Sequence, residues 1–117
     1  MSGPVYQTGL NGEDFALQYL LHKGMLLLAK RYRASDGEID LIMQDGHFLV
    51  FVEVKYRPRG RRGDGLLSIS PGKQRRILHA TTVYYSKLQD FSLQPRFDVV
   101  EITADGLCHL PDAFRPG

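Results

Sequence analysis

Residues 37–57 read GEIDLIMQDG followed by HFLVFVEVKYR, two apolar runs separated by a turn dipeptide. Asp-Gly between two runs of this kind is a strong local signal for a β-hairpin. We therefore predict a strand over 37–44, a two-residue turn at Asp45-Gly46, and a returning strand over 47–57. The returning strand is so apolar before its first charge that a place in the middle of a sheet is expected.

Each of these strands carries an acid where an apolar residue is expected, Asp40 in the first and Glu53 in the second. The turn implies a register in which 44 faces 47, 42 faces 49, 40 faces 51 and 38 faces 53. Side chains alternate between the two faces of a strand, so Asp40 shares a face with Glu53 and Lys55. The two carboxylates then lie as diagonal neighbours, roughly 7–8 Å apart at the backbone and within reach of one shared cation.

Two carboxylates and a lysine at one edge of a sheet are the groups that a metal-dependent phosphodiesterase needs. Mg²⁺ prefers oxygen ligands, which Asp40, Glu53 and the backbone carbonyl of Val54 can supply. Lys55 can orient the attacking water or stabilise the charge that develops at phosphorus. Histidine and cysteine are not clustered, which argues against a zinc site. No serine–histidine pair and no Walker loop is recognisable, which argues against serine hydrolases and P-loop enzymes.

Each of these residues also has a purely structural interpretation. Glu53 and Lys55 can form an ion pair on an exposed strand, although charges in so apolar a strand favour a functional role. Asp40 can be an exposed polar residue, and the sequence alone favours neither interpretation. Glu13 stands in the first turn of a predicted helix, where an acid more often stabilises the helix dipole.

The total charge of +2 hides a strongly basic segment. Residues 55–76 hold eight lysine and arginine side chains against the single acid Asp64, a net charge of +7, so the remainder carries −5. A basic region on a mildly acidic body indicates an anionic partner, with nucleic acid as the first candidate and a solvated charge run as the alternative. The side chains expected to contact nucleic acid are Arg57, Arg59, Arg61, Arg62, Lys73, Arg75 and Arg76.

The spacing of apolar residues predicts two helices. The first is capped by Asn11 and ended by Gly24. The second begins with Ser70 as its cap and Pro71 in its first turn, and Lys73 falls on the side of this helix that faces the core. The apolar stripes are Ala16, Leu17, Leu20 and Leu21 in the first helix, and Ile77, Ala80, Thr81, Tyr84 and Leu88 in the second.

Three further strands and a loop complete the expected chain. A strand over 25–32 precedes the first hairpin, and strands over 96–103 and 107–110 form a second hairpin with its turn at Asp105-Gly106. Residues 58–68 are rich in glycine and arginine and are expected to form a loop. The resulting order predicts an α/β fold in which a mixed five-stranded sheet is flanked by helices.

The length of 117 residues indicates a single domain spanning 1–117. Cys108 is the only cysteine, so no internal disulfide can form and nothing requires an oxidising compartment. The N-terminal residues lack the basic and apolar regions of a signal peptide, and the apolar runs are too short to cross a bilayer. We therefore expect a cytoplasmic protein that does not associate with membranes.

The set of motifs resembles the YraN-like family of small bacterial proteins, over nearly the whole chain. The matching segments are GEDFALQYL at 12–20, GEIDLI at 37–42, VFVEVKYR at 50–57, Lys73, and RFDVV at 96–100. That family is similar to the restriction-endonuclease-like superfamily, the PD-(D/E)xK nucleases, and in layout to the archaeal Holliday junction resolvases. One departure is that Ile39 stands where the superfamily has proline, and this proline is not needed for the chemistry.

The resemblance implies a restriction-endonuclease-like fold, with Asp40 and Glu53 as metal ligands and Lys55 as a catalytic residue. It further implies that Glu13 approaches the metal from the first helix and that Lys73 lies near the site from the second. The cofactor implied is Mg²⁺ or Mn²⁺. Resolvases of this fold act as two-fold dimers, so a homodimer is compatible with the resemblance, although the sequence marks no dimer face.

Three functions follow as hypotheses. The first is a Mg²⁺- or Mn²⁺-dependent endonuclease that acts on DNA, including branched or otherwise structured DNA. The second is a nucleic-acid-binding module that keeps the nuclease fold without turnover and binds mainly through phosphates. The third is a protein-interaction domain in which the basic segment is merely solvated.

Overall fold

The computed structural model describes residues 12–116, and these form helices and strands in the predicted order with one additional short helix. The first helix is short and precedes three consecutive strands, and a longer helix separates these from the last two strands. The elements are α2 (Glu13–His22), β1 (Leu26–Arg33), β2 (Glu38–Asp45), β3 (Phe48–Arg57), α3 (Asp64–Leu67), α4 (Pro71–Leu88), β4 (Gln94–Thr103) and β5 (Gly106–Leu110).

Among the described residues the strands form one mixed sheet in the order β1-β2-β3-β4-β5. β3 is the central strand, antiparallel to β2 and parallel to β4, and the other neighbouring pairs are antiparallel. The parallel pair needs a crossover connection, which the segment containing α3 and α4 provides. The expected α/β fold with a mixed five-stranded sheet flanked by helices is confirmed.

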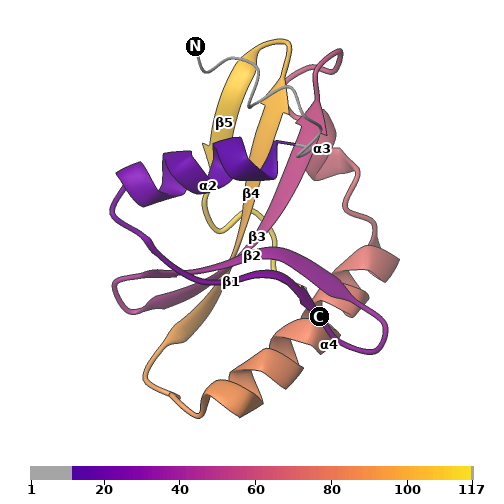
Figure 1. The fold of residues 1–117 in the computed structure, drawn as a ribbon. Coiled ribbons are helices and arrows are strands. Elements are labelled where there is room, and N and C mark those ends of the chain that lie inside the picture. The colour runs from indigo at the N-terminus through magenta and orange to yellow at the C-terminus, as the bar shows by residue number, and fades with distance from the viewer. Residues whose placement is uncertain (1–11, 117) are drawn as a thin grey trace.

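The sheet has an apolar layer on each face, and each layer is covered by a different helix (Figure 1). α2 packs on one face, where Leu20 contacts a cluster that includes Val50 and Val52 of β3. α4 packs on the other face, where Ile77 joins a cluster that includes Phe51. Alternate residues of β3 therefore enter opposite layers, and both layers bury them completely or almost so. No helix in residues 12–116 is long and apolar enough to cross a membrane.

The first hairpin turns one residue later than predicted. Asp45 pairs with Phe48, and the two-residue loop consists of Gly46 and His47 rather than Asp45-Gly46. Gly46 has a φ of 61°, the conformation that a type II′ turn requires at its first central residue. Asp45 stays in the strand, where its carboxylate accepts a hydrogen bond from Arg96 Nη1 at 3.1 Å. The predicted register was therefore wrong by two residues, and Ile42 faces Phe51.

The second hairpin shows the opposite displacement. Thr103 pairs with Gly106, so the loop is Ala104 and Asp105 rather than the predicted Asp105-Gly106. The hydroxyl of Thr103 accepts a hydrogen bond from the backbone N–H of Asp105 at 3.0 Å, which holds the loop in this position. In both hairpins the Asp-Gly pair identifies the turn, while contacts of the neighbouring side chains decide which two residues leave the ladder.

The helix ends agree in part with their predicted caps. The Ser70 hydroxyl accepts a hydrogen bond from the backbone N–H of Lys73 at 3.2 Å, as expected of an N-cap with Pro71 at the first helical position. The predicted cap of the first helix, Asn11, lies outside the described residues, and Gly12 directly precedes that helix. The predicted loop over 58–68 contains α3, a single turn of helix that no apolar spacing signalled.

Candidate functional site

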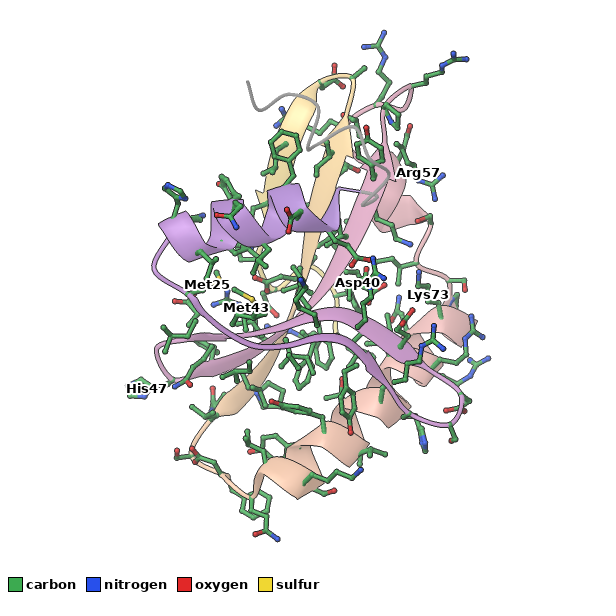
Figure 2. All side chains as sticks on the ribbon, in the orientation of Figure 1. Met25, Asp40, Met43, His47, Arg57 and Lys73 are labelled. Carbon is green, nitrogen blue, oxygen red and sulfur yellow. The ribbon has the colours of Figure 1, made fainter. Side chains whose placement is uncertain are left out.

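Asp40 and Glu53 line one pocket of about 370 Å³ between the sheet and the start of α4. Lys73 and Arg76 of α4 line the same pocket, and Figure 2 shows Asp40 and Lys73 side by side next to this helix. The two-residue error in register left the predicted faces unchanged, because a displacement by two keeps the alternation of side chains. The two acids are therefore brought together as expected from the sequence.

The ladder of paired backbone residues between β2 and β3 ends just before Asp40. The last backbone pair is Leu41 with Val52, and beyond it Asp40 Oδ2 accepts a hydrogen bond from the backbone N–H of Val54 at 2.8 Å. The carboxylate thus takes the place of a backbone carbonyl as the acceptor between the strands. Burial raises the pKa of Asp40, and the Val54 N–H opposes this rise, while the negative charge of Glu13 adds to it.

Glu53 lies deeper than Asp40 and is only 3% exposed. Its Oε1 lies 3.4 Å from Lys73 Nζ, whereas its Oε2 is buried with no hydrogen-bond partner in the described part of the chain. Burial raises the pKa of Glu53 to about 7, and the neighbouring charge of Asp40 contributes to the rise. A buried carboxylate with an unpaired oxygen is costly unless something else binds it.

Two lysines approach this pair of acids from different elements. Lys55 belongs to β3 and Lys73 to α4, and each of them shifts the pKa of the other. Burial and the neighbouring ammonium of Lys73 lower the pKa of Lys55 to about 8. Burial alone would lower the pKa of Lys73, but the hydrogen bond with Lys55 and the charge of Glu53 raise it. Of the two amines, Lys55 therefore releases its proton first as pH rises.

Glu13 does not join this group in the structure. Its Oε1 accepts a hydrogen bond from Arg31 Nε at 3.0 Å, and it lines a separate cavity with Asp14 and Lys30. The negative charge of Glu13 nevertheless raises the pKa of Asp40, which lines the pocket. A direct approach of Glu13 to a metal and the use of the Val54 carbonyl as a ligand both stay predictions.

The basic residues divide into separate groups rather than forming one surface. Arg76 reaches the pocket, and Arg75 is exposed on the same helix. Arg57 and Arg59 line a second, open cavity of about 620 Å³ at the end of β3, above the pocket in Figure 2. Arg61 and Arg62 contact the turn between β4 and β5, where Arg61 Nη1 lies 3.2 Å from Asp105 Oδ1 and the Arg62 N–H donates to Asp105 Oδ2 at 3.0 Å.

The sequence analysis missed two further buried acids, Asp98 and Glu101, both on β4 and both fully buried. The signal was present, because residues 97–102 read FDVVEI, an apolar run with two charges in it. The rule that drew attention to Glu53 applies equally to this strand. The analysis also missed Arg33, which lines the pocket and donates a hydrogen bond to Glu38 at 3.0 Å.

The acid pair has the composition of a site for a hard divalent cation. No three histidine, cysteine, aspartate or glutamate side chains within residues 12–116 are grouped closely enough to hold a metal ion by themselves. Mg²⁺ nevertheless uses as few as one or two carboxylates, with water and substrate phosphates completing its shell. The unpaired Glu53 Oε2 beside Asp40 fits such a ligand set, and the same two residues would hold the ion.

Comparison with known proteins shows the family to which this chain belongs. Residues 12–102 match the model of the uncharacterised protein family UPF0102. A UPF0102 protein of Nitrosococcus oceani is 45% identical over 112 residues, covering 92% of this chain and 90% of the relative. A UPF0102 protein of Janthinobacterium is 47% identical over 110 residues, covering 92% and 87%. One of Herminiimonas arsenicoxydans is 42% identical, covering 92% and 86%. The chain therefore belongs to the uncharacterised protein family UPF0102.

Proposed function

We propose that this protein is a metal-dependent endonuclease that hydrolyses phosphodiester bonds in DNA. One observation carries the proposal: beside Asp40, Glu53 holds a buried carboxylate oxygen that no group in the described part of the chain pairs with, and two lysines lie near the two acids. Buried charges without full pairing are retained where they bind something, and two acids with a lysine suit phosphoryl chemistry.

Asp40, Glu53 and Lys73 of the pocket, and Lys55, which does not line it, have distinct roles in this proposal. A bound Mg²⁺ or Mn²⁺ would supply a polarised water and positive charge for the phosphate. Asp40 and Glu53 hold this ion, and Asp40 is itself held by the Val54 N–H. Lys55, with a pKa of about 8, takes up or releases a proton at Nζ near neutral pH and so can orient the attacking water. Lys73, kept charged beside Glu53, offers an ammonium to the phosphate.

The proposed substrate follows from the charges around the pocket. Arg76 lines the pocket itself, and Arg57 and Arg59 line the open cavity at the end of β3. Arginine side chains at separate places around an acidic site suit a polyanion that extends beyond the scissile group, rather than a small phosphate ester. The resemblance to junction resolvases directs the proposal to DNA, including branched DNA.

The first test is a calorimetric Mn²⁺ titration of the intact chain, with and without DNA. We expect binding that is lost when Asp40 and Glu53 are both replaced by alanine. Cleavage is then assayed on linear, nicked and four-way-junction DNA with Mg²⁺ or Mn²⁺. Glu53→Gln is expected to lower the cleavage rate by about 100-fold or more, since it removes the charge that holds the ion.

The control for this test is Glu38→Gln. Glu38 lines the same pocket but is exposed and already paired with Arg33 at 3.0 Å. Cleavage by Glu38→Gln is expected to stay within about threefold of the unchanged protein. Cleavage that survives Glu53→Gln at full rate would show that the pocket is not the site of hydrolysis.

A non-catalytic nucleic-acid-binding module is the second candidate. The contact between Lys73 and Glu53 at 3.4 Å favours it, because an ammonium beside the carboxylate compensates part of its charge without any metal. This function predicts DNA affinity that falls steeply with salt and no cleavage with any divalent ion. Mn²⁺ binding that depends on Asp40 and Glu53, followed by cleavage, would rule it out.

A further inference from the structure

Glu101 is a fully buried acid that the proposed chemistry does not use. It lies on β4 in register with Lys55 of β3, so the two residues are neighbours across the parallel pair of strands. Glu101 is thus buried next to the proposed catalytic lysine, although it does not line the pocket of Asp40 and Glu53. A buried carboxylate is costly unless it is hydrogen-bonded, so the partners of Glu101 indicate what it does.

The partners of Glu101 are two backbone N–H groups at the start of α3. Gly63 N donates to Oε1 at 2.7 Å and to Oε2 at 2.9 Å, and Gly65 N donates to Oε2 at 2.7 Å. Charge-assisted hydrogen bonds of this length are among the stronger ones in proteins. Gly63 has a φ of 99°, a backbone conformation that side chains other than glycine rarely adopt. A carboxylate from β4 therefore caps a turn of helix that belongs to the basic segment.

This turn of helix packs closely against the stem of Lys55, that is, its Cβ and Cγ atoms. A Cβ atom added to Gly65 would lie 2.7 Å from Cβ and 2.9 Å from Cγ of Lys55, and 3.1 Å from Glu101 Oε2. The backbone of α3 thus lies directly against the first two carbons of the lysine side chain, and only glycine fits between them. These carbons set the direction in which the amino group leaves the strand.

We propose that Glu101 is a positioning residue, which holds Gly63 and Gly65 so that α3 confines the stem of Lys55 and directs its amino group toward Lys73 and Glu53. The hydrogen bonds from Gly63 and Gly65 to Glu101, and the close packing of Gly65 against Lys55, form one continuous chain of contacts. The catalytic importance of this arrangement rests on the proposed function. The arrangement itself does not, and it can be tested without any cleavage assay.

A purely structural role for Glu101 makes a different prediction. If Glu101 only ties the loop to β4, its loss frees the loop while Lys55 keeps the same side-chain order. The loop has other attachments, because Ala104 N donates to Gly60 O at 3.2 Å and Asp105 accepts a hydrogen bond from Arg62 N. Release of Gly63 and Gly65 can therefore be separated from release of the whole basic segment.

The test is nuclear magnetic resonance on the full chain without added metal, comparing the unchanged protein with Glu101→Gln and Gly65→Ala. Two quantities are measured: hydrogen exchange of the Gly63 and Gly65 amides, and the order parameter of the Lys55 side chain from ¹³C relaxation. Gly65→Ala keeps the carboxylate of Glu101, but its added methyl group forces α3 away from Lys55. If Glu101→Gln does not fold, Gly65→Ala therefore tests on its own whether α3 confines Lys55. Gly72→Ala is the matched control, since its added Cβ would lie 3.6 Å from the nearest atoms.

We expect Glu101→Gln to speed exchange of the two amides by about tenfold or more, because the charged acceptor is lost. In both variants the Lys55 order parameter should fall toward that of an exposed lysine, while Gly72→Ala leaves it unchanged. A Lys55 order parameter that is unchanged in either folded variant would overturn the proposal and leave Glu101 as a loop anchor. If the two variants show the expected loss of order and the unchanged protein cleaves no DNA, the proposed function alone would be contradicted.

Discussion

Two buried carboxylates in this molecule have opposite surroundings and therefore opposite properties. Burial alone would raise the pKa of Asp98, but the hydrogen bonds from His109 and Arg96 hold it below its usual value. Glu53 has the ammonium of Lys73 near one oxygen, its other oxygen has no hydrogen-bond partner within residues 12–116, and burial raises its pKa to about 7. At the scale of single residues, the surroundings of Asp98 favour its charged form, whereas those of Glu53 favour its protonated form.

The raised pKa of Glu53 predicts how the stability of the metal-free protein depends on pH. Between its ordinary value of 4.5 and about 7, folded Glu53 holds a proton that the unfolded chain has released. The free energy of unfolding therefore falls as pH rises through this range. Glutamine does not titrate, so the free energy of unfolding of Glu53→Gln should not fall in this way. At pH 8 this variant should be more stable than the unchanged protein by about 1–3 kcal/mol. Urea unfolding in a chelating buffer at pH 5 and pH 8 measures the difference.

Glu38→Gln serves as the control for this measurement, because Glu38 and Arg33 form an exposed ion pair. Its effect on the free energy of unfolding should stay within about 0.5 kcal/mol at both pH values. An unaltered pH dependence in Glu53→Gln would mean that Glu53 is charged in the metal-free protein, contrary to the surroundings described above.

At the scale of elements, one side of the pocket is formed where the turn between β1 and β2 contacts α4. Ala34 N donates to Gly37 O at 2.9 Å, which closes the turn. A Cβ added to Gly37 would overlap the backbone carbonyl of Arg76, so the absence of a side chain lets the turn touch the helix. Gly37 and Arg76 both line the pocket, and their contact closes one side of it.

Gly37→Ala should therefore destabilise the protein by about 1–3 kcal/mol, because neither the turn nor a backbone carbonyl can yield without cost. Urea unfolding at pH 7 provides the value. Gly72→Ala in the first turn of α4 is the matched substitution, and its added methyl group meets no atom closer than 3.6 Å. That variant should be neutral or more stable, by up to ~1 kcal/mol. Equal effects of the two substitutions would contradict a close contact at Gly37.

At the scale of the whole molecule, Asp98 joins β4 to β5 and to the segment after β5, and Arg96 extends this network to the first hairpin. Its carboxylate accepts hydrogen bonds from Arg96 at 2.9 Å, from His109 Nε2 at 2.8 Å and from the backbone N–H of Asp112 at 3.0 Å. Arg96 also donates to Asp45 at the end of β2. One buried acid thus connects the first hairpin, β5 and the segment that follows β5.

Asp98→Ala should cost about 3–5 kcal/mol of unfolding free energy at pH 7, because it leaves the partly buried guanidinium of Arg96 without its main partner. Hydrogen exchange should also accelerate at Ala113, whose N–H donates to Phe97 O at 2.7 Å. Asp112→Asn is the control, since Asp112 pairs on the surface with Arg115 and its own backbone N–H is retained. A change of less than about 1 kcal/mol in Asp98→Ala would show that this network does not hold the molecule together.

Local sequence patterns predicted most of the strands and the placement of three residues that line the pocket, Asp40, Glu53 and Lys73. The alternation of apolar residues placed Asp40 and Glu53 on one face, and an error of two residues in register did not disturb that placement. Ser70 and Pro71 indicated the start of α4 and with it the side on which Lys73 lies. These predictions succeeded because side-chain direction repeats every two residues in a strand and every few in a helix, whatever the rest of the molecule does.

The sequence by itself thus determined the order of elements, the central place of β3 and the identity of the acid pair. Tertiary structure alone decided which charges meet. Glu13 pairs with Arg31 rather than with a group in the pocket. Arg61 pairs with Asp105 at the turn between β4 and β5. Glu101 accepts hydrogen bonds from the start of α3 and does not line the pocket. The physical reason is that the direction of a side chain is set locally, whereas the partner of a charge is whichever opposite group the packing of distant segments brings within a few ångströms.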